Sequence, residues 1–162
     1  MADDILTDKG QILARMAESR RAFQSALSGA DRTRLDQPGT WGEWSVKDMI
    51  AHLTYWQTLA TERLQKFAAG RGNEIVSLET GEVDAINAHV YRANKERPLD
   101  EMLNACEIAY LTLRTAVKQL PPAVYTEDQQ PRSMREIIAG NSYLHYEEHL
   151  PDVQSLELER EV

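Results

Sequence analysis

Apolar residues recur at helical spacing along most of the chain, and polar stretches rich in glycine and proline separate them. The first such segment runs from about Thr7 to Leu27, and arginine and glutamate occupy the faces opposite its apolar side. The apolar side consists of Ile12, Leu13, Met16, Phe23 and Leu27. Spacings of three and four residues are typical of an amphipathic helix. We therefore predict a helix here, followed by a polar loop that extends to Gly42.

The second predicted helix has a clear start. Ser45 is a favourable N-cap residue, and Asp48 three residues later completes a variant of the capping box. The apolar stripe that follows contains Val46, Met49, Ile50, Leu53, Trp56, Ala60, Leu64 and Phe67. Gly70 and Gly72 then mark the end of the helix.

Two further helical patterns lie in the middle of the chain. Residues 81–95 place Val83, Ile86 and Val90 on one face, which predicts a shorter helix that buries these three side chains. Pro98 opens the next helix, because a missing amide costs little in a first turn. The stripe of this helix ends at Pro121–Pro122 and contains Leu99, Met102, Leu103, Cys106, Tyr110, Leu113, Val117 and Leu120.

The last predicted helix begins with the capping box of Ser133 and Glu136. It is expected to run from Met134 to about Leu150, where Pro151 would end or kink it. The acidic tail that follows, to residue 162, either forms a second short helix or frays.

These patterns predict an all-α fold in one domain spanning residues 1–162. Long amphipathic helices bury their apolar faces against each other, so we expect an antiparallel four-helix bundle with an additional helical segment. The connections after the first and second helices, about 15 residues each, are longer than simple bundle turns. Loops of this kind commonly carry substrate contacts.

Charge and composition narrow the range of functions. The net charge of −8 over 162 residues argues against nucleic acid or an anionic membrane as the main partner, because both require a basic face. Cys106 is the only cysteine, so no intrachain disulfide forms, and its place on an apolar stripe predicts a buried side chain rather than a nucleophile. The N-terminal segment is acidic and unlike a signal peptide, and no segment approaches the roughly 20 apolar residues that span a bilayer. We expect a cytoplasmic protein.

Two histidines on the last predicted helix carry the first chemical signal. His145 and His149 are four residues apart and share the inward stripe of Ile137 and Ile138. Two neutral imidazoles presented in this way are able to chelate one metal ion. The alternative is that one or both are core histidines with satisfied hydrogen bonds, and the pair alone does not decide between these readings.

His52 is the third candidate ligand. It lies at the edge of the second helix's stripe, between the faces of Met49 and Trp56, where a side chain is able to point into a cleft between helices. Asp48, one turn earlier, is a candidate to orient the imidazole, although helix capping alone also explains this residue. The alternative is a boundary histidine that bonds to a neighbouring group.

The sequence resembles the DinB/YfiT-like family of metal-dependent proteins. The segment EWSVKDMIAHLTYW at residues 43–56 is similar to the family's tryptophan-to-histidine entry into its second helix, and HYEEH at residues 145–149 is similar to its histidine pair. The spacing of about 90 residues between the two segments also agrees. The resemblance covers the chain to about residue 152. It implies a four-helix bundle in which His52, His145 and His149 hold a divalent ion, nickel or zinc, with the remaining positions open to water.

A second resemblance concerns the branch of the superfamily. The segment DAINAHVYRAN at residues 84–94 is similar to the ClbS/DfsB branch, whose best-known member protects its host against a genotoxin. That branch does not consistently keep the histidine triad. Because His149 is present here and the triad is complete, we expect the metal site.

An open three-histidine site favours catalysis, because a closed structural zinc site has four protein ligands. A metal in such a site lowers the pKa of bound water or of a thiol, and the family resemblance implies relatives that are thiol-dependent transferases and isomerases. We therefore expect a metal-dependent enzyme that acts on a small molecule, with S-transfer from a low-molecular-weight thiol as the leading version. Glu148 beside the histidine pair is the candidate catalytic base or orienting partner, and a salt bridge to an arginine is its alternative role.

Other readings stay open at this point. One alternative is a non-catalytic binding protein whose pocket sequesters a small molecule, as in ClbS-like self-protection or a stress response. Another is an interaction module in which the histidines are structural polar groups.

Helix pairing favours a homodimer. His89 lies off the stripe of its helix and is expected at the surface, whereas Asn87 and Asn141 lie on inward faces, either to bond a substrate or to specify the bundle. Tyr55 and Trp56 are candidate pocket walls.

Overall fold

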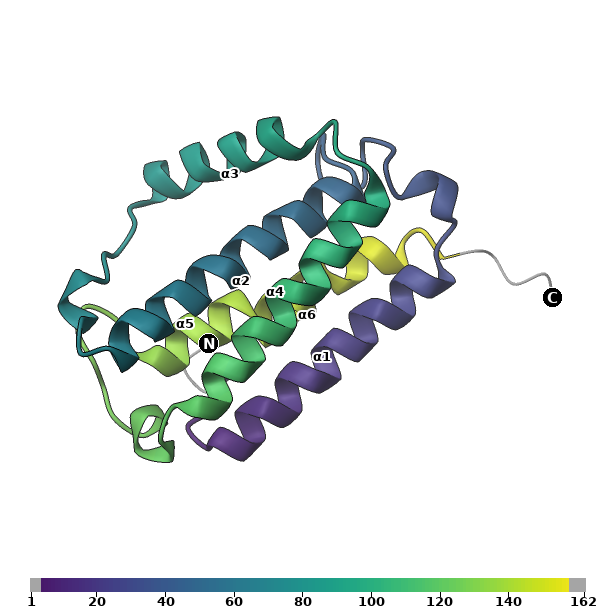
Figure 1. Ribbon diagram of the computed structural model, residues 1–162. Coiled ribbons are helices and arrows are strands. Elements are labelled where there is room, and N and C mark those ends of the chain that lie inside the picture. Colours follow the sequence, from purple (N-terminus) through teal and green to yellow (C-terminus); the bar gives the residue numbers. More distant parts are fainter. Residues whose placement is uncertain (1–3, 158–162) are drawn as a thin grey trace.

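The computed structural model describes residues 4–157, and its regular elements there are helices (Figure 1). In chain order they are α1 Lys9–Gly29, α2 Val46–Ala68, α3 Thr80–Asn94, α4 Leu99–Gln119, α5 Met134–Asn141 and α6 Tyr143–Gln154. The predicted all-α fold, a helical bundle with an additional segment, is confirmed. None of the described helices combines the length and the apolar character needed to cross a membrane.

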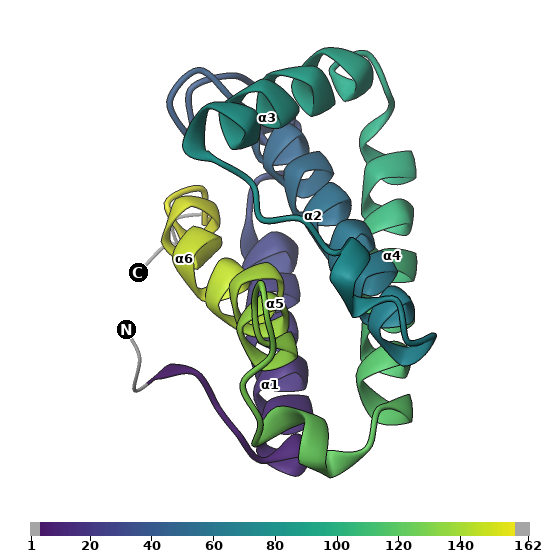
Figure 2. The same ribbon diagram turned by 90° about the vertical axis from the view of Figure 1, so that its left-hand side faces the viewer.

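The bundle consists of two helix pairs that run in opposite directions. α1 packs along α6, and α2 packs along α4. The ammonium group of Lys9 at the start of α1 donates to the carbonyl of Leu120 just after α4, so these two helices are antiparallel. Ala30 after α1 instead pairs with Glu157 after α6, so α1 and α6 run in the same direction. α3 lies outside the bundle against α2 and returns the chain, which lets α2 and α4 share a direction (Figures 1 and 2).

The predicted apolar stripes form one core between these helices, with fully buried side chains from five of the helices. They include Ile12, Met16, Phe23, Met49, Leu53, Met102, Leu113, Ile137, Ile138 and Tyr146. α3 differs from the prediction, because among its three apolar positions only Val90 is buried while Val83 and Ile86 are half-buried. The reason is that α3 packs mainly on α2 alone.

The capping predictions for α2 and α5 are confirmed. The Ser45 hydroxyl accepts a hydrogen bond from the backbone amide of Asp48, and the Asp48 carboxylate accepts one from the backbone amide of Ser45. Ser133 and Glu136 form the equivalent box at the start of α5. Each box satisfies amides that a helix N-terminus leaves without an intrahelical partner.

The prediction of one continuous last helix is wrong. Ser142 has φ −134° and ψ −100°, outside the helical region, and it separates α5 from α6. The side chains of Asn141 and Ser142 donate to the carbonyls of Ile137 and Ile138. The backbone amide of Ser142 donates to Ala139, so the Ser142 hydroxyl takes its place at the carbonyl of Ile138. Pro151, which was expected to end or kink the helix, does not end it, since α6 continues to Gln154. The acidic residues 158–162, predicted as a short helix or a frayed tail, lie outside the described residues.

Candidate metal centre

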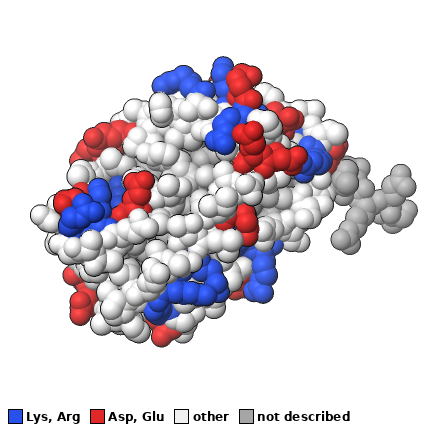
Figure 3. All heavy atoms as spheres, viewed as in Figure 1, with Lys and Arg blue, Asp and Glu red and all other residues white. Residues whose placement is uncertain are grey.

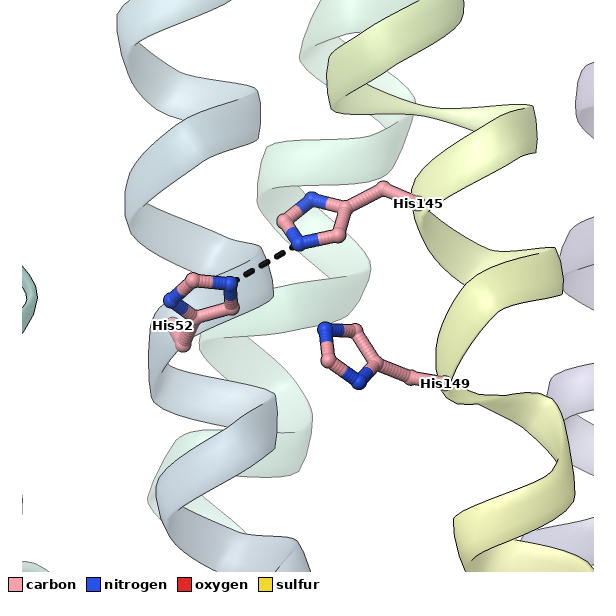
Figure 4. A group of neighbouring side chains, drawn as sticks. All are labelled: His52, His145 and His149. Carbon is pink, nitrogen blue, oxygen red and sulfur yellow. Dashed lines mark hydrogen bonds between the residues drawn. The ribbon is translucent and has the colours of Figure 1, made fainter. Parts of the chain in front are cut away.

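The structure brings the three candidate histidines together in the interior of the bundle (Figure 4). His52 of α2 faces His145 and His149 of α6, and one ring nitrogen from each residue lies within 4.8 Å of the other two. The Nε2 atoms of His52 and His145 are 2.8 Å apart. All three side chains are buried, with relative exposures of 5%, 8% and 2% in chain order.

Two of the imidazoles are oriented by a bond on the opposite side of the ring. Nδ1 of His52 lies 3.1 Å from Oδ1 of Asn87 on α3, and the same oxygen accepts from the indole N–H of Trp56 at 2.9 Å. Because the indole nitrogen only donates, it fixes which end of the amide faces His52, and Nδ1 of His52 then carries the proton. Nδ1 of His149 lies 3.4 Å from the Asp152 carboxylate. In both residues Nδ1 is bonded to an oxygen and Nε2 faces the other histidines, an arrangement that is typical of metal-bound histidines.

His145 is held differently. Its Nδ1 is buried and has no hydrogen-bond partner among the described residues, while its Nε2 contacts only His52. A neutral imidazole has one donor and one acceptor nitrogen, so one of the two ring nitrogens is unsatisfied as a hydrogen-bonding group. Unsatisfied buried side-chain nitrogens are uncommon, and Nε of Arg20 is the other one among the described residues.

Burial keeps all three histidines neutral near pH 7. The pKa of His52 is lowered to about 4, mainly by burial and also by the neighbouring His149, while the bond to Asn87 opposes the change. Burial also lowers the pKa of His145 well below its ordinary value, with added effects of His52 and His149. The pKa of His149 is lowered by burial, although the bond to Asp152 and the charge of Glu148 raise it. Neutral imidazole is the form that binds a metal ion.

Aromatic rings connect the surroundings of the triad with an open cleft. The Trp41 ring lies 4.4 Å from the His149 ring and 5.1 Å from the His52 ring, measured between centroids. The neighbouring Trp44 stacks on Tyr91 of α3 with an interplanar angle of 8°. Trp41 and Trp44 are paired across a tight turn in which Gly42 has φ +59°, a conformation that favours glycine.

The cleft lies between this turn and α3 and has a volume of about 660 Å³. Asn87 belongs both to its lining and to the hydrogen bonds that orient His52. The acidic side chains of Glu43 and Asp84 and the basic side chain of Arg92 line the cleft, together with the aromatic rings of Trp41, Trp44 and Tyr91. A concave, mostly aromatic surface with a few polar groups is typical of small-molecule sites.

The remaining sequence candidates are placed as follows. Glu148 is exposed rather than on the inner side of α6, and its catalytic role stays a prediction. Asp48 belongs to the capping box and not to the surroundings of His52. Cys106 is buried, as expected, and His89 is exposed. Trp56 contributes to the hydrogen bonds around His52, so its prediction as a site residue agrees with the geometry.

Three residues near the triad were missed or left undecided by sequence reasoning. Asp152 is three residues after His149, and this helical spacing was a signal that could have identified it. Asn87 was recognised as an inward polar residue, but nothing in the sequence indicated His52 as its partner. Trp41 gave no signal, because it lies in an irregular loop whose path depends on tertiary packing.

Comparison with known families agrees with this architecture. Residues 16–137 match the family model of the mycothiol maleylpyruvate isomerase N-terminal domain. The chain belongs to this family. The matched residues include His52 and end before His145 and His149, so the family match covers one of the three candidate ligands. No curated protein matches the sequence.

Three solved structures share the fold over almost the whole chain. An uncharacterised protein from Escherichia coli UTI89 has a TM-score of 0.80 at 13% identity, with 94% of both chains covered. The colibactin self-resistance protein ClbS has a TM-score of 0.81 at 13% identity, covering 94% of this chain and 96% of its own. Sibling Lethal Factor Precursor, DfsB, has a TM-score of 0.76 at 14% identity, covering 93% and 95%. The family and these neighbours confirm the DinB-like assignment with similarity to ClbS and DfsB.

The ClbS structure contains double-stranded DNA, which runs against the expectation that the present chain does not bind nucleic acid. At 13% identity the likeness concerns the fold alone. Figure 3 shows acidic and basic side chains interspersed on the face drawn, without a continuous basic surface there. The absence of nucleic-acid binding therefore stays a prediction based on net charge.

Proposed function

We propose that the protein is a metal-dependent enzyme that acts on a small molecule, with S-transfer from a low-molecular-weight thiol as its reaction type. The observation that carries the proposal is the convergence of three neutral imidazoles within 4.8 Å beside an open aromatic cleft. Three nitrogen donors suit late first-row ions, and nickel and zinc are the ions we propose.

The residues present fit such an ion. His52 and His149 each have Nδ1 held by an oxygen atom, so their Nε2 lone pairs are directed into the cluster. When bound, the metal would act as a Lewis acid that lowers the pKa of a thiol or of water at its open positions. The protein contributes a buried setting, and the cleft between Trp44 and α3 would hold the substrate. Glu148, whose negative charge raises the pKa of His149, is the proposed general base.

A second candidate function is non-catalytic binding of a small molecule, as in self-protection or a stress response. The likeness to ClbS, described as a colibactin self-resistance protein, favours it. The same cleft and triad would then hold a ligand without turnover. We also propose a homodimer, and sedimentation analysis of the purified chain would test this assembly.

Addition of a thiol to the cobalt-substituted protein tests the proposed reaction type. An open three-histidine site is expected to bind the thiolate directly, which produces a thiolate-to-cobalt charge-transfer band in the near ultraviolet. The assay then adds an electrophilic acceptor and follows thiol consumption. A band with metal-dependent turnover supports the transferase, a band without turnover supports the binding protein, and no band at saturating thiol contradicts thiol activation.

Replacing Asn87 by alanine is expected to weaken metal binding by about 10–100-fold. The substitution removes the oxygen that accepts from both His52 and Trp56, so the His52 ring loses its fixed orientation and its preferred tautomer. Competition with a chromophoric chelator measures the affinity. Asn94→Ala on the same helix is the matched control, because Asn94 bonds to Val90 and Arg97 instead of the triad. Equal affinities in the two variants would contradict the orienting role of Asn87.

A further inference from the structure

A small pocket beyond the triad contains two basic side chains. It lies between α2, the loop that joins α2 to α3, and α5, and its volume is about 120 Å³. Arg63 of α2 and Arg132 just before α5 both line it, together with the polar side chains of Ser77 and Asn141 and the ring of Trp56. None of the three triad histidines belongs to this lining.

The two arginines are not neutralised by a carboxylate within residues 4–157. The salt bridges there involve other arginines, and the side chain of Arg63 donates instead to the backbone carbonyl of Val76 at 3.2 Å. Arg63 is half-buried and Arg132 is exposed, and both line the same pocket. Burial, and to a smaller extent the charge of Arg132, lowers the pKa of Arg63. Two like charges at one partly enclosed pocket carry an electrostatic cost that an anion would remove.

We propose that Arg63 and Arg132 form a binding site for an oxyanion, the carboxylate or phosphate group of a small molecule. Guanidinium groups present several N–H donors in a plane that matches the oxygens of either group. The two arginines approach from different elements, α2 and the segment before α5, so an anion between them would contact both. Ser77, whose hydroxyl group is able to donate, is also part of the lining.

The pocket lies further along α2 than the triad. Trp56 of its lining is four residues after His52, whereas Arg63 is eleven residues after it. At 1.5 Å of rise per residue, Arg63 is roughly 16 Å along α2 from His52. A small molecule that reached both sites would therefore need an acidic end about three helical turns from its reacting end. The oxyanion site does not depend on the metal, because its residues differ from the proposed ligands.

Thermal unfolding of the metal-free protein with phosphate or acetate, at constant ionic strength in a chloride buffer, tests the proposal. We expect phosphate at about ten times its Kd to raise the Tm by roughly 3–5 °C, since a ligand that binds only the folded state stabilises it. The rise should disappear in Arg63→Gln and in Arg132→Gln. It should persist in Arg71→Gln, a matched control in which the exposed Arg71 pairs with Glu74.

A further measurement keeps the proposal falsifiable. The anion response should also survive in a variant that lacks all three triad histidines, which separates this site from the proposed metal centre. A response to phosphate alone assigns a phosphate group, and a response to acetate as well assigns oxyanions generally. An identical response in all variants, or none to either anion, would overturn the proposal.

Discussion

Replacing His145 by alanine is expected to weaken zinc or nickel binding by more than about 100-fold. Structural zinc sites with four protein ligands bind with about 10–16 kcal/mol, which corresponds to roughly 3 kcal/mol for each ligand. His145 is central to this site, because its Nε2 is 2.8 Å from Nε2 of His52 while its Nδ1 has no partner among the described residues. Metal analysis of tag-free protein, followed by chelator competition, would measure the loss.

His89→Ala is the matched control for this substitution. His89 is exposed on α3 and does not belong to the three-histidine group, so its removal should leave the metal content at about one ion per chain. His52→Ala and His149→Ala should resemble His145→Ala. Circular dichroism would establish that each variant is folded. If metal content stayed the same in all three triad variants, or if the unchanged protein bound no nickel or zinc at all, the metal proposal would be wrong.

Several features of this site could be predicted because they are local in sequence. His145 and His149 are one helical turn apart, so their shared direction follows from helix geometry alone, and the break at Ser142 lies before both of them. The placement of His52 at the edge of the α2 stripe also follows from periodicity. Glu148, in contrast, is next to His149 in sequence, and neighbouring residues on a helix diverge by about 100°, which explains its exposure.

The parts that could not be predicted depend on contacts between distant segments. Asn87 reaches His52 only because α3 returns along the outside of α2, and an amphipathic pattern does not specify which helix it covers. Trp41 is positioned by a turn between two helices, where no periodic pattern exists. The break at Ser142 coincides with two side chains that bond to helix carbonyls, and periodicity does not reveal it, because such bonds also occur inside the unbroken α2.

Tyr146→Phe is expected to lower the free energy of unfolding by about 2–4 kcal/mol, the second large effect. The Tyr146 side chain is 1% exposed, and its hydroxyl oxygen accepts from Arg20 and from Gln57, each at 3.0 Å. Burial raises the pKa of Tyr146, so the hydroxyl stays neutral. Arg20 is itself 6% exposed and pairs with the half-exposed Glu107 at 2.7 Å. Without the hydroxyl, two buried donors each lose one acceptor. Urea unfolding would measure the change.

Tyr125→Phe supplies the matched control, because Tyr125 is equally buried but donates a single hydrogen bond, to the carbonyl of Val117. Its cost should be about 1 kcal/mol. Equal costs for the two variants would mean that the Arg20 network contributes no more than one ordinary hydrogen bond. Metal affinity gives a second comparison: Tyr146 follows His145 but bonds to α1 and α2 rather than to the triad. Tyr146→Phe should therefore leave metal affinity nearly unchanged, which would place stability and metal binding on different faces of α6.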